Sequence, residues 1–323
     1  MSGTIYGPVV QVSGAEGDVS VALSPERPVY RVDNFPFDRP RLTSDQARAQ
    51  PVRLLQARYQ SVEFTGRAAE LARLARWRDG PDTASVLLLH GPGGQGKTRM
   101  ATQFAHESHV RGWRVLEARH STQVASAASS PAPVADEEGA LLIADYAERW
   151  PTADLLEMLT DAVRQRGRSA RVLLICRAAG MWWQSLAHRL DNLGLPAEKL
   201  ALGPLADEPG LDIGTLFVGA VRTFAAALAV PGAVDLAPPM PAGGRWADRG
   251  FGRVLAVHMA ALATVDRWLQ RNRMSRWTPW PTSLRTCCGA NVFTGRCCTR
   301  TAQCRPTRTR SPTRHTRLRS PGR

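Results

Sequence analysis

A glycine-rich segment between a strand-like run and a helix-forming run restricts the fold of this chain more than any other feature. Residues 86–89 are all apolar, and the pattern G-x-x-x-x-G-K-T follows at residues 91–98. Such a loop wraps nucleotide phosphates with its backbone N–H groups at the N-terminus of the next helix. The pattern predicts a P-loop, or Walker A motif, in which Lys97 reaches the β/γ-phosphates and Thr98 presents its hydroxyl to Mg²⁺.

The glycines of this loop are needed because a side chain would block either the tight turn or the close approach of a phosphate. The alternative is a glycine-rich turn that binds no ligand. The complete motif and the presence of both flanking elements favour the phosphate-binding loop.

Further apolar runs alternate with helix-forming stretches along the next hundred residues. The runs are nearly continuous in Val, Leu and Ile, which is typical of strands buried on both faces. Strands and helices in this alternation predict a parallel sheet covered by helices. The expected strands are 86–89, 113–118, 141–145, 172–176 and 200–202, and the expected helices of the core are 68–77, 99–107, 152–165 and 182–193.

The fold class that follows is α/β, a three-layer αβα P-loop NTPase with a small, partial α-helical subdomain. Composition then divides the chain into four parts. We expect a short β or unfolded segment (1–50), the P-loop core (51–205), a helical subdomain (206–270, with helices at 211–228 and 251–269) and a basic tail without ordered structure (271–323). A Ser-, Ala- and Pro-rich stretch at 121–133 predicts a surface insertion.

The formal net charge of +14 belongs to the tail. Fourteen arginines and no acidic residue lie from Arg267 onward, so the 28 acidic residues of the body meet an equal number of basic ones. No secretory signal pattern opens the chain. The most apolar long window, 211–234, is interrupted by charged residues and a proline, which favours a buried helix over a membrane span. We therefore expect a cytoplasmic protein that makes no membrane contact.

Asp145, Glu148 and Arg177 are the candidates for chemistry beside the P-loop. Asp145 ends an apolar run, where a Walker B carboxylate would hold Mg²⁺, although it could also cap the next helix. Tyr146 follows it in place of a second carboxylate. Glu148 is then the nearest candidate for activating water, its alternative being a solvated loop residue, and turnover is expected to be slow. Arg177 is expected to contact the γ-phosphate, its alternative being a surface salt bridge.

Several segments together resemble the signal-transduction ATPases with numerous domains (STAND), which are relatives of the NB-ARC and AAA+ groups. The segments are GPGGQGKT, LLIADYAE, VLLICR and LGPL, and the upstream FTGR with Glu70 looks like the family motif that covers the adenine. The resemblance spans about residues 54–266. It implies an ATP/ADP-dependent conformational switch in signal transduction, in which the nucleotide governs self-association or contact with an attached sensor.

Two features depart from the family pattern. The segment around residues 254–265 lacks the Gly-x-Pro turn, although His258 is a candidate nucleotide-sensing residue there if it is not simply a core or surface histidine. No repeat of twenty to fifty residues follows residue 266, so a sensor array is not evident. A catalytically inactive interaction module that keeps the fold is a further alternative.

The predicted site binds ATP or ADP with Mg²⁺. The absence of a guanine-reading N-K-x-D sequence favours ATP only weakly. The residues with expected catalytic roles are Lys97, Asp145, Glu148 and Arg177, and the expected metal ligands are Thr98 and Asp145. The expected nucleotide contacts are Phe64, Gly66, Arg67, Gly91, Pro92, Gly93, Gly94, Gln95, Gly96, Lys97, Thr98 and Arg99.

The tail holds five of the six cysteines, whereas Cys176 stands alone in an apolar run of the body as a small buried side chain. The cysteine pairs of the tail do not have the C-x₂-C spacing of a zinc site. A basic arm that binds nucleic acid by counterion release is a second interpretation, and would make the protein an AAA+-like nucleic-acid-associated regulator.

We favour a third interpretation of the tail, a frameshift. Residues 285–294, back-translated with GC-rich codons and shifted by one base, become an amphipathic, charge-mixed helix. The expectation is that the C-terminal part of the protein, with any sensor or partner-binding region, is missing here.

Overall fold

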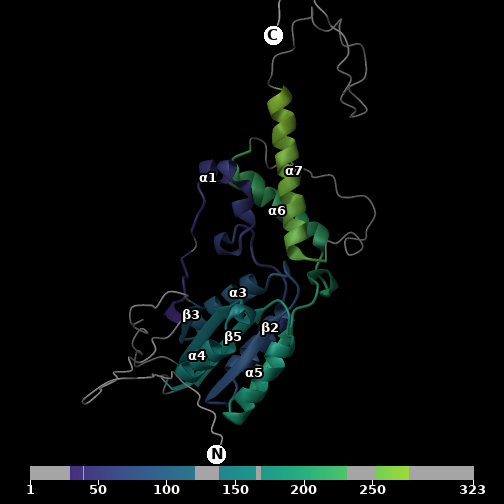
Figure 1. Ribbon diagram of the computed structural model, residues 1–323. Coiled ribbons are helices and arrows are strands. Elements are labelled where there is room, and N and C mark those ends of the chain that lie inside the picture. The colour runs from purple at the N-terminus through teal and green to yellow at the C-terminus, as the bar shows by residue number, and fades with distance from the viewer. Residues whose placement is uncertain (1–29, 39, 121–137, 165–168, 231–251, 276–323) are drawn as a thin grey trace, which may run out of the picture. The chain divides into compact units, whose positions relative to one another are not determined.

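The computed structural model describes residues 30–38, 40–120, 138–164, 169–230 and 252–275 (Figure 1). A six-stranded sheet in the order β1-β3-β4-β5-β2-β6 lies at its centre. The strands are β1 (Tyr30–Asn34), β2 (Ala84–His90), β3 (Trp113–His120), β4 (Gly139–Asp145), β5 (Ser169–Cys176) and β6 (Ala197–Ala201). The expectations for residues 9–22, for the 121–133 insertion and for the tail after residue 275 lie outside the described residues.

Seven α-helices and four short 3₁₀ helices accompany the sheet in the described part of the chain. The α-helices are α1 (Ser44–Ala49), α2 (Ala68–Arg78), α3 (Lys97–Val110), α4 (Thr152–Arg164), α5 (Met181–Asn192), α6 (Ile213–Ala227) and α7 (Val254–Ser275). The 3₁₀ helices are η1 (Pro51–Leu55), η2 (Ala57–Tyr59), η3 (Ala147–Arg149) and η4 (Leu205–Asp207). All these elements, except the last two residues of α7, belong to one structural unit that ends at residue 273.

The expected parallel sheet is confirmed for five of the six strands. β3, β4, β5, β2 and β6 pair in parallel, with Leu142 opposite Val172 and Leu88 opposite Leu174. The sheet has one more strand than expected, because β1 pairs antiparallel with β3 at the edge. β1 has no periodic apolar pattern of its own, so the sequence predicts it only through the expectation of a short β or unfolded segment within residues 1–50.

Contacts on either side of the sheet hold β1 and the segment after it in place. The hydroxyl group of Tyr30 donates a hydrogen bond to Asp161 of α4. The ring of Phe37 stacks on His109 of α3 at a centroid distance of 4.4 Å. The edge strand is therefore positioned by tertiary contacts rather than by its own sequence pattern.

Alternating side chains of the central strands build two separate cores, which confirms the three-layer arrangement. Val86 and Leu88 of β2 point to the face covered by α4 and α5, where Leu159 and Leu186 are fully buried. The intervening Leu87 and Leu89 point to the face covered by α2 and α3, together with Leu74, Met100 and Phe104. Both faces of the strands are dry, so continuous apolar runs are favoured over alternating ones.

A third core belongs to the helices, and α6 and α7 lie side by side in it (Figure 1). Phe217 and Phe224 of α6 pack there with Val257 and Ala261 of α7. Ala47 of α1, Leu54 of η1 and Val62 join the same core. Residues that precede the P-loop thus contribute to the helical cluster, and the helix α1 was not expected within residues 1–50.

The apolar window at 211–234 begins as a helix with a polar cap. Asp212 accepts hydrogen bonds from the backbone N–H groups of Gly214 and Thr215 at 3.1 and 2.9 Å, which satisfies two donors at the start of α6. The helix then buries Ile213, Phe217, Val221 and Phe224. None of the helices described here has both the length and the apolar character needed to cross a bilayer.

Two glycines offer a matched test of the packing around β4. A Cβ atom on Gly139 would lie 2.6 Å from Trp113 and 2.7 Å from the carbonyl oxygen of Ser169, whereas one on Gly219 in α6 would meet nothing within 4 Å outside its own helix. We expect Gly139→Ala to lower the free energy of unfolding by about 1–3 kcal/mol through overpacking. Gly219→Ala should raise it by up to about 1 kcal/mol through helix propensity. Urea denaturation of the full chain measures both, and equal effects would contradict this packing.

Candidate functional site

A cavity of about 320 Å³ lies at the carboxyl ends of the central strands, where β2, β4 and β5 end. This volume is within the range of small-molecule sites. Predicted site residues that line it are Phe64, Arg67, Gly93, Gly94, Gln95, Gly96, Lys97, Thr98, Arg99, Asp145, Glu148 and Arg177. Gly66, Gly91 and Pro92 are not among the lining residues, although the carbonyl oxygens of Gly91 and Pro92 bind the ammonium group of Lys97.

The loop between β2 and α3 takes a conformation that glycine permits. Gly94 and Gly96 have φ values of 83° and 90°, in the left-handed region. At Gly91 the restriction is space, because a Cβ atom would lie 2.6 Å from the carbonyl oxygen of Leu202. Lys97 donates hydrogen bonds from Nζ to the carbonyl oxygens of Gly91 at 2.6 Å and Pro92 at 3.0 Å. These bonds hold the ammonium group inside the loop, and burial lowers the pKa of Lys97.

Thr98 and Asp145 meet across the cavity. The hydroxyl group of Thr98 donates to Asp145 Oδ2 at 2.8 Å, and the backbone N–H of Tyr146 donates to Oδ1 at the same distance. Burial raises the pKa of Asp145, and its hydrogen bonds with Thr98 and Tyr146 oppose that shift. The two side chains come from α3 and β4, and β5 lies between β4 and the P-loop strand β2.

The separation of these two oxygens fits a shared Mg²⁺ ion. Two ligands at adjacent positions of a magnesium octahedron lie roughly 2.9 Å apart. No group of three or more His, Cys, Asp or Glu side chains in the described ranges could hold a metal. Thr98 and Asp145 supply a hydroxyl and a carboxylate here, and such a pair suits an ion that completes its shell with phosphate and water oxygens.

Glu148 is fixed by the end of the neighbouring strand. Its Oε1 accepts a hydrogen bond from the backbone N–H of Arg177 at 3.1 Å. Its Oε2 is buried and has no hydrogen-bond partner among the described residues. Glu148 lines the cavity beside Asp145, so the carboxylate has one oxygen available for a ligand or a water molecule. The Arg177 side chain is exposed and also lines the cavity, which leaves its guanidinium free to approach a ligand.

Cys176, at the end of β5, is buried as expected and also lines the cavity. Burial raises the pKa of its thiol to about 12, and nearby Glu148 adds to the shift. A neutral thiol is a poor nucleophile, so Cys176 contributes shape to the site rather than chemistry.

Arg67 is buried beside the P-loop and forms several hydrogen bonds with the surrounding segments. Its guanidinium donates to Glu70 at 2.9 Å and to the carbonyl oxygen of Gly203 at 2.8 Å. Its backbone N–H donates to both carboxylate oxygens of Glu208, each at 2.7 Å. A Cβ atom on Gly66 would lie 2.6 Å from the same carboxylate, which explains the glycine before Arg67. Glu208 follows η4 on the way to α6, and no motif in the sequence indicated it.

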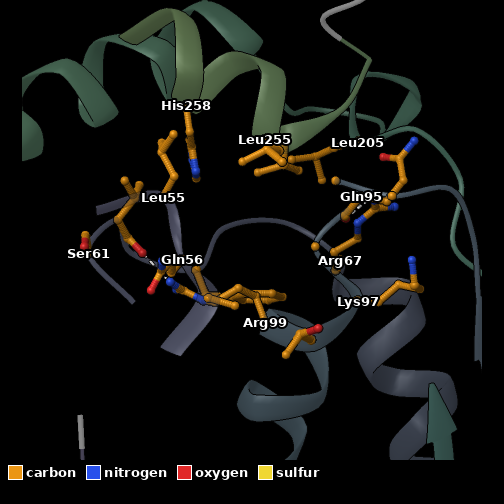
Figure 2. A pocket seen from close by; sticks show the side chains of 18 of the residues that line it. Leu55, Gln56, Ser61, Arg67, Gln95, Lys97, Arg99, Leu205, Leu255 and His258 are labelled. Atoms are coloured by element: carbon orange, nitrogen blue, oxygen red, sulfur yellow. Dashed lines mark hydrogen bonds between the residues drawn. The ribbon is translucent and has the colours of Figure 1, made fainter. Parts of the chain in front are cut away.

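The remaining walls of the cavity are formed by η1, by the segment after it and by α7. Figure 2 shows Leu255 and His258 projecting from α7 toward the cavity, with Gln56 and Ser61 on the other side and Lys97 at the opposite end. Arg99 donates a hydrogen bond to the carbonyl oxygen of Val62 at 2.8 Å and ties α3 to this wall. Gln56, Ser61 and Leu255 could not be predicted as site residues, because they belong to no motif and meet only in the folded chain.

Comparison with known families gives one match. Residues 57–189 match the family described as novel STAND NTPase 5, and the matched range includes the P-loop, Asp145, Glu148 and Arg177. The range ends before η4, α6 and α7. No curated protein matches the chain.

Among solved structures the similarity is distant. NtrX from Brucella abortus is 16% identical with a TM-score of 0.39, over 68% of this chain and 55% of that one. C. elegans PCH-2 is 15% identical with a TM-score of 0.33, over 64% and 68%. The ORC2 protein of Aeropyrum pernix is 14% identical with a TM-score of 0.37, over 66% and 71%. The chain thus spans little more than half of NtrX, and similarities of this size establish no shared activity.

The environment of His258 predicts a loss of stability in acid. Burial, with a smaller contribution from Arg99, lowers the pKa of His258 to about 4, and its ring packs edge-on against Phe224. The unfolded chain binds the proton at a pKa of about 6.5, so the free energy of unfolding should fall as the pH drops from about 6.5 toward 4. The slope from this group approaches about 1.4 kcal/mol per pH unit.

A non-titrating variant isolates this contribution from that of the carboxylates. His258→Gln should reduce the fall in denaturation midpoint between pH 6.5 and 4.5, measured with urea at several pH values. An identical pH profile for the two proteins would mean that His258 is protonated as easily in the folded state as in the unfolded chain.

Proposed function

We propose that the protein binds ATP and ADP with Mg²⁺ in the cavity above the P-loop, since residues 57–189 match the family described as novel STAND NTPase 5. We propose further that it works as a nucleotide-dependent switch with slow hydrolysis. The observation that carries the proposal is the contact between Thr98 and Asp145, because it brings a hydroxyl and a carboxylate from separate elements together beside the P-loop.

The P-loop residues would bind the phosphates. Lys97 Nζ is bonded to the carbonyl oxygens of Gly91 and Pro92, so its charge is already positioned inside the loop. An anionic phosphate oxygen is a stronger acceptor than a neutral carbonyl oxygen, so a bound nucleotide would compete well for this ammonium group. The N-terminus of α3, which begins at Lys97, adds its partial positive charge.

Thr98 and Asp145 would hold the Mg²⁺ ion through Oγ1 and a carboxylate oxygen. The ion, when bound, neutralises charge on the phosphates. The raised pKa of Asp145 supports this role, since a carboxylate that burial makes costly to ionise gains from a neighbouring cation.

Glu148 would orient the attacking water and Arg177 would contact the γ-phosphate. One oxygen of Glu148 is held by the Arg177 N–H and the other has no partner among the described residues, which suits a group that accepts a hydrogen bond from water. The carboxylate does not directly follow Asp145, since Tyr146 and Ala147 lie between. We propose that turnover is slow because one oxygen of this carboxylate is held by the backbone N–H of Arg177, at the end of the next strand.

The switch would act through the walls of the cavity. The P-loop core contributes one wall, and η1, α6 and α7 contribute Leu55, Leu216 and His258 to the other. We assume two conformations that differ in how the core contacts the helical cluster. A ligand that binds one of them more tightly would shift the population toward it. We retain the division into a core (51–205) and a helical subdomain (206–270) as part of this proposal, along with self-association or a protein partner as its output.

The first test is Lys97→Ala. It should lower the affinity for ATP and ADP by about 10- to 100-fold, since one charge-assisted donor to phosphate is lost. The readout is nucleotide that co-purifies with the full chain, measured by mass spectrometry, together with binding of a fluorescent ADP. Lys199→Ala is the matched control, because Lys199 is the chain's other lysine and lies exposed on the edge strand β6. Unchanged affinity in Lys97→Ala would overturn the assignment.

The second test is Glu148→Gln, which keeps an acceptor for the Arg177 N–H but removes the base. ATP binding should stay close to that of the wild-type protein, while hydrolysis should fall by about 100-fold. Release of inorganic phosphate under single-turnover conditions measures the step, with Glu107→Gln on the distant part of α3 as control. If Glu148→Gln hydrolyses ATP at the wild-type rate, another group activates the water.

A further inference from the structure

A backbone carbonyl group of the P-loop accepts a hydrogen bond from a backbone N–H group at the start of α7. The backbone N–H of Leu255, the second residue of the helix, donates to the carbonyl oxygen of Gly94 at 3.0 Å. The carbonyl oxygen of Arg253, the residue before the helix, accepts hydrogen bonds from the N–H groups of Ala256 and Val257 at 2.9 and 3.3 Å. N–H groups in the first turn have no acceptor in their own helix, so the loop supplies one.

This bond also fixes the orientation of one peptide group in the phosphate-binding loop. The Gly94–Gln95 peptide is trans, so its C=O and N–H point in opposite directions. Because the C=O of Gly94 is directed at α7, the N–H of Gln95 is directed away from α7. Gly93, Gly94 and Gln95 line the cavity, and backbone N–H groups of this loop are the donors that a phosphate requires.

The next peptide group of the loop, between Gln95 and Gly96, is contacted by Arg67 rather than by α7. A guanidinium nitrogen of Arg67 lies 3.5 Å from the carbonyl oxygen of Gln95, at the long end of hydrogen bonding. Lys97 restrains the first part of the loop through Gly91 and Pro92. The peptide between Gly94 and Gln95 is restrained by α7, a helix of the third core, which is formed mainly by α6 and α7.

The contact is close enough to demand glycine at residue 94. A Cβ atom there would lie 3.1 Å from Leu255 Cβ, and the φ value of 83° disfavours any other residue. Leu255 is 38% exposed and contributes no deep burial, so the backbone bond is the specific element of this contact.

We propose that the backbone N–H of Leu255 is a positioning group for the phosphate site: by holding the Gly94 carbonyl it presents the Gln95 N–H to the phosphates of a bound nucleotide. The inference rests on the proposed nucleotide function and adds the route by which that site is regulated. Coupling between two bound states is reciprocal, so phosphate that orders the Gln95 peptide strengthens the docking of α7 by the same factor. Val257 and Ala261 of α7 pack in the core with α6, so stronger docking of α7 would also hold α6 more firmly.

The test compares two proline variants of the full chain. Leu255→Pro removes the N–H that reaches the loop, whereas Ala256→Pro removes an N–H bonded only to Arg253 in the same turn. Proline is tolerated in the first turn of a helix, and each substitution places the same restriction on the residue before it. We expect Leu255→Pro to weaken ADP binding about three- to tenfold and Ala256→Pro to change it less than about twofold.

Two further readouts separate positioning from general damage. Adenosine has no phosphate, so its affinity should be the same in both variants. Hydrogen exchange of the α7 amides should slow on ADP addition in the wild-type protein and in Ala256→Pro, and should not respond in Leu255→Pro. Where Leu255→Pro does not fold, replacing Leu255 by leucic acid removes the same N–H through a backbone ester and keeps the side chain.

The outcomes are distinguishable. A wild-type protein that does not bind ADP overturns the proposed function. Wild-type binding with equal losses in Leu255→Pro and Ala256→Pro, or with parallel losses for adenosine, overturns the positioning role and leaves nucleotide binding intact. A selective loss for ADP in Leu255→Pro alone supports the role.

Discussion

The orientation of uncharged peptide groups in the P-loop is the constraint on which the candidate site depends. A backbone amide attracts phosphate only when its N–H points into the cavity, and a flexible glycine-rich loop has no intrinsic reason to keep it there. Three contacts supply that order: Lys97 bonds to the first part of the loop, Arg67 lies against the carbonyl of Gln95, and Leu255 holds the carbonyl of Gly94. Each comes from a different element, so the loop is ordered by the packing of the fold.

The same contacts connect the site to the helices. Glu208 accepts the backbone N–H of Arg67 with both oxygens, and the chain then enters α6. Leu255 and His258 of α7 reach the cavity from the third core. A ligand in the cavity would contact both the sheet and the helical cluster, which is the arrangement that a nucleotide-dependent switch requires. The residues N-terminal to the P-loop join this cluster through Leu54 and Val62, so segments near both ends of the described chain pack in one core.

Much of the α/β core was predictable because its signals are local. The centres of β2, β4 and β5 are continuous apolar runs, because both faces of these strands are buried. β1 and α1 were not predicted as such, since five or six residues of mixed polarity carry little periodic signal. The positions of Thr98 and Asp145 in sequence suggested a shared ion, but their 2.8 Å contact depends on a sheet order in which β5 lies between β2 and β4.

The sequence by itself predicted the loop, because glycine, lysine and threonine at this spacing are typical of a phosphate-binding turn between a strand and a helix. It also determined the three-layer core, because apolar runs of strand length must be buried. Only the tertiary structure decided which distant groups hold that loop and the neighbouring Arg67: Leu255 binds the carbonyl group of Gly94 through a backbone N–H, and Glu208 binds the backbone N–H of Arg67 through its carboxylate. In both pairs the partners lie more than a hundred residues apart in the sequence. Every residue other than proline has such an N–H, so no pattern of side chains could reveal its partner.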